Sequence, residues 1–243
     1  MSPDLPPLPD DWSRALAIAA HPDDLEYGTN AAVAAWTAAG RSVSYVLATR
    51  GEAGIAGTPP EVAGPLREAE ERASAAAVGV HDVRFLGHRD GVVTEGLDLR
   101  RDLAREIRRA RPQLVVVSNH RDTFGLNTRG LGTWNSADHR AVGRATLDAV
   151  GDAGNEWVFR ELIDEGFETW SGVRHVVVAA SPQPTHAVDV TGWRDVAIAS
   201  LAEHRAYLAA LDPRPVVEQA REVVLMTTGG EGGPARVPFE VFG

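Results

Sequence analysis

Apolar and polar positions follow two alternating patterns along this chain. Short apolar runs predict β-strands at 15–20, 43–49, 82–86, 114–118 and 173–180. Between these runs, apolar residues spaced three or four positions apart predict helices over 28–39, 65–78, 99–111, 137–150, 193–211 and 216–226. Strands that alternate with helices in this way predict an α/β fold with a mainly parallel sheet and helices on both of its faces.

The segments between these elements predict loops within a single domain. Residues 1–11 contain four prolines and predict an irregular lead-in, and glycines and prolines mark a loop at 51–64. The loop at 119–135 is longer, and loops of this length in compact domains are often functional. A flexible turn at 229–233 precedes a β-like tail. Because the sequence shows neither repeats nor a low-complexity domain, we interpret residues 1–243 as one domain.

Composition and charge narrow the class of protein. Hydrophobic residues make up 44% of the chain and charged residues 24%, which is ordinary for a soluble domain. The net charge of −10 argues against binding to nucleic acid or to an anionic membrane surface. No apolar run approaches transmembrane length, and the first dozen residues lack the basic start of a signal peptide, so a cytoplasmic location is expected. The absence of cysteine leaves His, Asp and Glu as candidate metal ligands.

The sequence His21-Pro22-Asp23-Asp24 directly follows the first predicted strand. In open α/β sheets, ligands bind at the carboxyl ends of the strands. His21 and Asp24 lie three residues apart across a turn that Pro22 stiffens, and an imidazole with a carboxylate suits a catalytic zinc. Asp23 lies between them and is available to accept a proton from a water. Two adjacent aspartates before a helix could equally be helix caps, so the spacing alone leaves both interpretations open.

The stretch from Ala20 to Glu26 resembles the Ala-His-Pro-Asp-Asp-x-Glu signature of the PIG-L/LmbE-like deacetylases. These are metal-dependent enzymes that remove N-acetyl groups from aminosugars. Further segments resemble motifs of the same family in the same order: 50–54, 67–79, 86–91 and 138–143. The resemblance covers most of the chain and implies a Rossmann-like fold.

The resemblance also implies a metal site. His21, Asp24 and His139 would bind one Zn²⁺ per chain, although iron, cobalt or manganese would also suit these ligands. Asp23 would act as the general base on the metal-bound water, the nucleophile. An alternative for His139, as a lone histidine at a helix start, is an ordinary surface residue.

Three further positions resemble family residues that bind sugar hydroxyls: Glu52, Arg67 and Asp90. Arg67 could instead form a surface ion pair with Glu70. The expected partner is thus a small-molecule aminosugar, and the chain could also form a homo-oligomer.

The second metal motif departs from the family pattern. Where the family has a histidine proposed to stabilise the oxyanion, this chain has Ser136. His120 follows the strand at 114–118, so we expect it at the same sheet edge as His21, oriented by Asp122 and acting in place of the missing histidine. The alternative is that His120 only hydrogen-bonds the loop backbone. If His120 takes this role, Ser136 and Asp138 would remain as helix-cap groups, although the family's aspartate at the position of Asp138 orients a histidine. We interpret His204 as a packing residue.

These observations favour a metal-dependent hydrolase that removes an N-acetyl or other N-acyl group from a small aminosugar-like substrate. The alternative is a catalytically altered, metal-stabilised binding protein of the same fold. A dinucleotide-binding enzyme is disfavoured, because the turn after the first strand lacks a Gly-rich phosphate loop.

Overall fold

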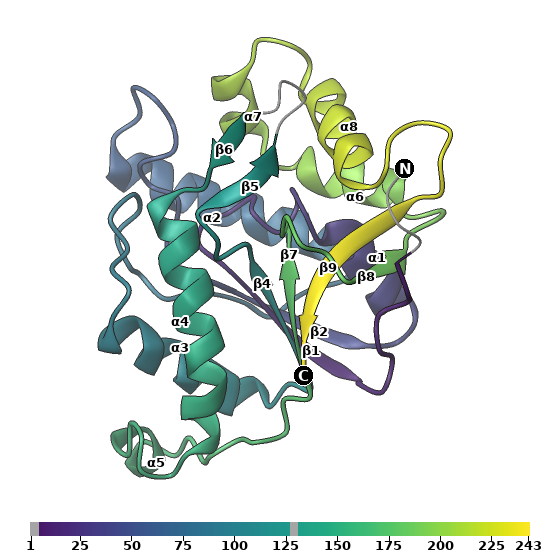
Figure 1. The fold of residues 1–243 in the computed structure, drawn as a ribbon. Helices are drawn as coiled ribbons and strands as arrows, with labels where there is room; N and C mark the ends of the chain where they lie inside the picture. Colours follow the sequence, from purple (N-terminus) through teal and green to yellow (C-terminus); the bar gives the residue numbers. More distant parts are fainter. Residues whose placement is uncertain (1–4, 127–130) are drawn as a thin grey trace.

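A seven-stranded sheet forms the centre of the structure, a computed structural model that describes residues 5–126 and 131–243. The strand order is β3-β2-β1-β4-β7-β9-β8 (Figure 1). The first five of these strands are parallel, whereas β9 is antiparallel to both of its neighbours. The strands are β1 (Arg14–Ala19), β2 (Ser42–Leu47), β3 (Val83–Phe85), β4 (Leu114–Ser118), β7 (His175–Ala179), β8 (His186–Asp189) and β9 (Arg236–Phe242).

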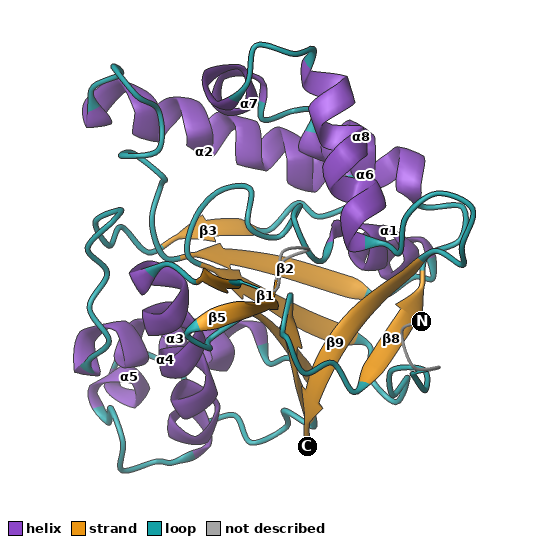
Figure 2. Cartoon of the chain, turned by 45° about the horizontal axis from the view of Figure 1, so that its top comes forward, coloured by secondary structure: helices purple, strands orange, loops and turns teal. Residues whose placement is uncertain are grey.

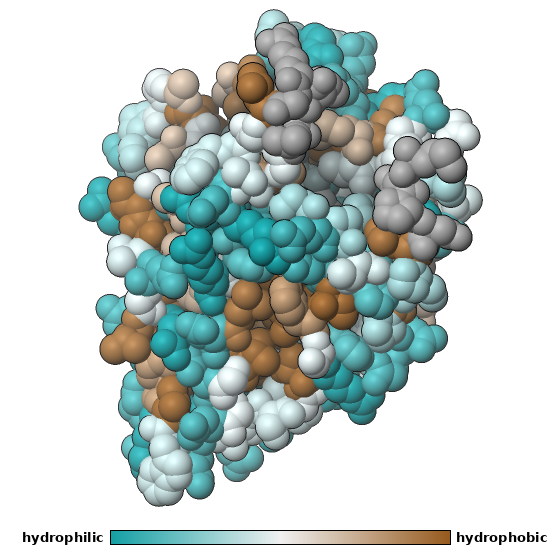
Figure 3. Space-filling view, viewed as in Figure 1, coloured by the Kyte–Doolittle hydropathy of each residue, from teal (hydrophilic) through white to brown (hydrophobic). Residues whose placement is uncertain are grey.

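Helices cover both faces of the sheet (Figure 2). One face packs against α1 (Asn30–Ala38), α2 (Pro60–Ala77), α6 (Arg194–Leu201), α7 (Arg205–Leu211) and α8 (Val216–Thr227), and the other against α3 (Leu97–Ala110), α4 (Ala137–Gly154) and α5 (Glu161–Asp164). Successive side chains of β1 point to opposite faces, so Ala17 joins one hydrophobic core and Ile18 the other. Between α4 and β9, an apolar area of the sheet remains visible at the surface (Figure 3). The predicted α/β fold is therefore confirmed.

The structure corrects several predicted element boundaries. Helix α2 begins at Pro60, and Pro65, where we placed the start, lies inside it. Pro60 is well suited to the first turn, where a proline loses no hydrogen bond. The predicted helix over 193–211 is two helices, α6 and α7, with His204 as the residue that precedes α7. The edge strand β8 and the short helix α5 were not predicted.

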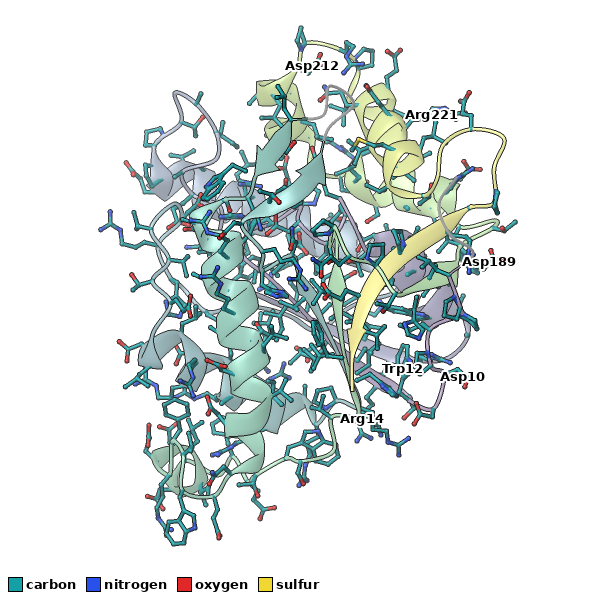
Figure 4. The ribbon with its side chains drawn as sticks, viewed as in Figure 1. Asp10, Trp12, Arg14, Asp189, Asp212 and Arg221 are labelled. Atoms are coloured by element: carbon teal, nitrogen blue, oxygen red, sulfur yellow. The ribbon has the colours of Figure 1, made fainter. Side chains whose placement is uncertain are left out.

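The loop at 119–135 contains an antiparallel hairpin of β5 (Thr123–Leu126) and β6 (Gly132–Trp134). Residues 127–130, between these strands, lie outside the described part of the chain. At the other end of the sheet, Arg14 begins β1 and lies low in Figure 4, whereas Asp212, which follows α7, and Arg221 of α8 lie near the top of that view. No described helix is long and apolar enough to cross a membrane.

The connections place a crevice at the carboxyl edge of the sheet. The chain passes from β1 to β2 and β3 on one side, then returns to β4 on the other side of β1. Ile18 of β1 therefore pairs with Val46 of β2 and with Val117 of β4. At such a switch point, successive connections leave the sheet in opposite directions, and the space between them is where open α/β sheets bind ligands.

Candidate active site

His21, Asp24 and His139 meet above the carboxyl end of β1. His21 Nδ1 lies 3.2 Å from His139 Nε2 and 3.4 Å from Asp24 Oδ2. His139 Nε2 lies 2.9 Å from Asp24 Oδ1. Two residues of the turn after β1 thus converge with one from the first turn of α4, as the sequence predicted.

Hydrogen bonds from the surrounding chain fix each of these side chains. Asp24 Oδ2 accepts the backbone N–H groups of Ala20 and His21, at 3.1 and 2.8 Å. His139 Nδ1 lies 2.8 Å from Asn135 Oδ1, so its other ring nitrogen faces His21. Burial opposes ionisation of Asp24, but the imidazoles of His139 and His21 hold its pKa well below the ordinary value. This carboxylate therefore remains charged and available as a ligand.

The second nitrogen of His21 faces two carboxylates. Its Nε2 lies 3.2 Å from Asp138 Oδ2 and 3.1 Å from Asp90 Oδ1. Asp138 also accepts the backbone N–H groups of Gly91 and Val93, at 2.7 and 3.0 Å, so the loop before α3 holds its position. A carboxylate behind a histidine fixes the orientation of the ring and raises its basicity as a ligand. Ser136, not Asp138, caps α4: its hydroxyl accepts the His139 N–H at 3.1 Å.

This cluster fits a divalent metal. Two imidazole nitrogens and a carboxylate oxygen are the donors of many catalytic zinc sites, and tetrahedral zinc holds such donors roughly 3.3 Å apart. The two imidazole nitrogens lie 3.2 Å apart, near this value, and each lies 2.9 to 3.4 Å from a different oxygen of Asp24. Two histidine nitrogens that face each other across 3.2 Å need either a proton or a cation between them. The donor atoms of His21, Asp24 and His139 would therefore suit a divalent metal.

Asp23 lies beside these candidate metal ligands in a strained backbone conformation. Its φ of 99° is unusual for a residue other than glycine and costs roughly 1–3 kcal/mol. Its N–H donates to Glu71 Oε2 at 3.2 Å, and its Oδ1 accepts from Arg67 Nη2 at 2.6 Å. Burial raises the pKa of Asp23 to about 6, although the Arg67 guanidinium opposes this. A carboxylate held beside a metal site with such a pKa suits a general base near neutral pH.

Two of the three predicted substrate-binding residues line the cavity above this cluster. Arg67 is 2% exposed and donates to Asp23 and to the backbone oxygens of Gly51 and Pro22, so it holds the Asp23 carboxylate and does not pair with Glu70. Asp90 faces His21 and accepts the Ala53 N–H at 2.8 Å. Glu52 is not among the cavity residues, because its oxygens accept the backbone N–H groups of Arg50 and Asp90.

His120 does not reach this cavity, contrary to our expectation. Its ring packs 6.3 Å from the ring of Phe242, and its Cβ lies against Gly143 of α4, so the side chain points away from the site. Asp122 does not orient it either, because that carboxylate is 3.2 Å from Arg144 and 3.5 Å from Arg140. The side chain of a residue two positions after a strand can point to either face of the sheet. The apolar pattern of the strand did not specify which face His120 would take.

The cavity over the cluster has a volume of about 700 Å³, within the usual range for ligand sites. Sequence reasoning missed four of its larger side chains: Tyr27, Phe124, Tyr207 and Met226. The Arg67 guanidinium stacks on the Tyr207 ring, 4.0 Å from its centre.

A buried cluster lies behind Asp23, on the side away from the cavity. His204 Nε2 is 3.6 Å from both Glu26 Oε1 and Glu71 Oε2, and all three side chains are fully buried. Glu26 also accepts hydrogen bonds from Asn30 and Ser74. His204 is thus a buried packing residue, as expected, but one that faces two carboxylates.

We expect this cluster to make stability depend on pH. Burial disfavours the imidazolium, but the carboxylates of Glu26 and Glu71 raise the pKa of His204 from 6.5 to about 9. Because the folded pKa exceeds the unfolded one, the stabilisation is complete below about pH 6.5 and is lost as pH rises toward 9. Denaturant unfolding at pH 6, 7.5 and 9 should show a fall in the free energy of unfolding that His204→Gln reduces. Equal falls in the two proteins would contradict this.

Comparison with known proteins identifies the family. The sequence profile of a family described as GlcNAc-PI de-N-acetylase, PIG-L, matches residues 16–150, more than half of the chain. The chain belongs to the PIG-L family. The resemblance seen in the sequence is therefore confirmed, and the matched range contains all the proposed metal ligands. Deacetylases of this family are metal-dependent, in agreement with the ligand cluster.

Two relatives of this PIG-L protein are deacetylases of aminosugar compounds. The 1D-myo-inositol 2-acetamido-2-deoxy-alpha-D-glucopyranoside deacetylase of Thermobifida fusca is 30% identical over 183 residues, which cover 61% of the chain and 60% of that relative. The diacetylchitobiose deacetylase of Thermococcus kodakarensis is 27% identical over 81% of the chain and 70% of the relative. The chain thus spans about 60% of the length of the Thermobifida protein.

Solved structures share the fold of this PIG-L protein. The N,N'-diacetylchitobiose deacetylase of Pyrococcus horikoshii superposes with a TM-score of 0.81 at 21% identity, covering 96% of the chain and 84% of that structure. The conserved protein TT1542 of Thermus thermophilus gives 0.71 at 26%, covering 93% and 92%. A 4-carboxy-2-hydroxymuconate hydratase of Pseudomonas putida gives 0.72 at 17%, covering 95% and 96%. Since this fold also carries a hydratase, function must be argued from the site.

Proposed function

We propose that this PIG-L protein is a metal-dependent hydrolase that removes an N-acetyl group from a small aminosugar-like substrate. The observation that carries the proposal is the position of Asp23, a buried carboxylate beside His21, Asp24 and His139 at the floor of a cavity. Its relatives from Thermobifida and Thermococcus, both named as deacetylases of acetylated aminosugar compounds, support the same reaction.

The residues at the cavity floor have separate roles in amide hydrolysis. A divalent metal held by His21, Asp24 and His139, with zinc the best match to these donors, supplies Lewis acidity toward a water and an acetamide carbonyl. Asp23 accepts the proton of the attacking water and then returns it to the nitrogen of the departing amine. The Arg67 guanidinium, 2.6 Å from Asp23 Oδ1, favours the ionised form of the base and fixes its direction.

Substrate contacts follow from the same geometry. Asp90 Oδ1 faces His21 Nε2, and its Oδ2 accepts the Ala53 N–H, so the carboxylate is held rigidly at the cavity floor. A carboxylate in this position accepts hydrogen bonds from sugar hydroxyls beside the acetamide. Arg67 also lines the cavity, but it is 2% exposed and its Nε is buried, so it acts through Asp23.

The replacement of the family's oxyanion-stabilising histidine by Ser136 keeps a second function open, a metal-stabilised binding protein. Ser136 lines the cavity, but its hydroxyl already accepts the His139 N–H. The two functions are separated by an assay for liberated amine on N-acetylated aminosugars, with purified protein first stripped of metal and then reloaded with zinc. We expect amine and acetate in equal amounts, and only after reloading. Stoichiometric zinc binding without any product would favour the binding protein.

A further inference from the structure

The peptide unit between Pro22 and Asp23 is held at both of its ends by helix α2. Its oxygen, which belongs to Pro22, accepts a hydrogen bond from Arg67 Nη2, and its N–H donates to Glu71 Oε2 at 3.2 Å. Arg67 and Glu71 lie four residues apart, so they are neighbours on one face of the helix. The two side chains therefore fix the plane of this peptide and oppose its rotation.

This peptide sets the backbone conformation of Asp23. Rotation of a peptide plane changes the φ of the residue that follows it, so the plane that α2 fixes corresponds to the φ of 99° at Asp23. A residue other than glycine keeps such a φ only where the surrounding structure imposes it. On its other side, the Asp23 oxygen accepts the N–H groups of Glu26 and Tyr27, at 3.0 and 3.2 Å. Both peptide units that flank Asp23 are thus fixed, and with them the direction of its carboxylate.

The fold does not otherwise account for the position of Glu71. Its side chain is fully buried and is not among those that line the cavity. Within the described part of the chain, the Asp23 N–H is the one hydrogen-bond donor to Glu71, and the other carboxylate oxygen, Oε1, has no partner. His204 Nε2 lies 3.6 Å from Oε2, beyond hydrogen-bond length. A buried carboxylate with a single hydrogen bond costs stability, so its position is best explained by the peptide that it holds.

We propose that Glu71 is a positioning residue for the general base. By accepting the Asp23 N–H, it keeps the 22–23 peptide in the strained orientation that presents the Asp23 carboxylate to the cavity, while Arg67 holds the carboxylate itself. Without this acceptor the buried N–H is unpaired, and rotation of the peptide relieves both the lost bond and the strain. The inference rests on the proposed function, in which Asp23 is the base, and adds to it a residue that lies outside the cavity.

Two variants of Glu71 separate the effect of its hydrogen bond from that of its charge. Glu71→Leu removes the acceptor, whereas Glu71→Gln keeps an oxygen at the same reach and loses the charge. With methyl N-acetylglucosaminide and zinc-loaded protein, we expect kcat to fall about tenfold or more in Glu71→Leu but to stay within about threefold in Glu71→Gln. KM and zinc content should not change. Glu68→Leu, on the same helix, is the matched control: Glu68 pairs with Arg50 and Arg72, so its loss should leave kcat unchanged.

A double-mutant cycle tests whether Glu71 acts through Asp23. In the Asp23→Asn background the base is already absent, so Glu71→Leu should change the residual kcat by less than about twofold. A role in general packing would instead lower kcat by the same factor in both backgrounds, and that result would overturn the proposal. A kcat within about twofold of the unaltered protein in Glu71→Leu alone would overturn it as well.

Crystal structures of the variants give a readout that needs no turnover. In Glu71→Leu the 22–23 peptide should be rotated and the φ of Asp23 negative, whereas Glu71→Gln should keep the positive φ. An unchanged φ in Glu71→Leu overturns the proposal. If the unaltered protein releases no amine, the hydrolase proposal fails, and the rotation of the peptide alone then decides whether Glu71 holds Asp23. If Glu71→Leu does not fold, Glu71→Asp, which keeps the charge but is one methylene shorter, replaces it in each measurement with the same expected results.

Discussion

Replacement of His139 by Ala is expected to remove tight metal binding and all measurable amine release while leaving the fold in place. The variant deletes the nitrogen that lies 3.2 Å from His21 Nδ1 and 2.9 Å from Asp24 Oδ1. The two remaining ligands cannot retain the metal at ordinary concentrations. The Ser136 cap of α4 uses the backbone N–H of residue 139, so the helix start should survive. Elemental analysis, circular dichroism and the amine assay measure the three effects.

A variant of a second histidine, outside the cavity, serves as the control for this result. His81 is exposed and precedes β3, away from the cavity, so His81→Ala should keep both metal and turnover. Full metal content in His139→Ala would falsify the ligand assignment. Metal loss in both variants would point instead to adventitious binding by surface histidines.

Conversion of Asp23 to Asn should keep the metal but lower kcat by roughly 10²–10⁴-fold, the usual contribution of a general base. Asn fits the same volume and, like Asp, tolerates the left-handed backbone region better than other residues, so the φ of 99° can be retained. Its side chain can still accept the Arg67 hydrogen bond, but it cannot take a proton from water. Metal content and kcat, measured on the same preparation, give the two results.

Asp24→Asn is the matched comparison for this variant. The neighbouring carboxylate faces both histidines, so its replacement should weaken metal binding as well as turnover. If Asp23→Asn lost its metal as Asp24→Asn does, the roles given to the two residues would be wrong. A kcat within tenfold of the unaltered protein would show that another group accepts the proton.

The sheet and the principal cluster could be predicted from the sequence for clear physical reasons. Residues such as Ile18 and Val117 lie on strands buried on both faces, where continuous apolar runs are unambiguous. The turn after β1 places His21 and Asp24 at the switch point by local sequence alone. Spacing could not predict that His139 lies in this cluster, because more than a hundred residues separate it from Asp24. That prediction rested on the family resemblance.

The parts that sequence reasoning missed depend on long-range contacts. Arg67 was expected to bind substrate, but its guanidinium donates to the buried carboxylate of Asp23, and no local pattern links a helix residue to a turn 44 positions earlier. The contact between Glu71 and the Asp23 N–H arises in the same way. The orientation of the His120 side chain depends on the backbone conformation of the residues that follow β4. The β5–β6 hairpin was not predicted, because its strands are too short to show the alternation of apolar and polar residues that is typical of a strand.

The division of the cavity between two regions of the chain has a consequence for how relatives of this protein can diverge. The proposed ligands and base all lie within residues 16–150, the range that the family profile matches. Tyr207 and Met226 lie beyond that range, on helices α7 and α8. Changes that alter the choice of substrate can therefore arise outside the part of the sequence that carries the proposed reaction. In such an arrangement, one catalytic half can be inherited unchanged while the C-terminal helices drift toward new compounds.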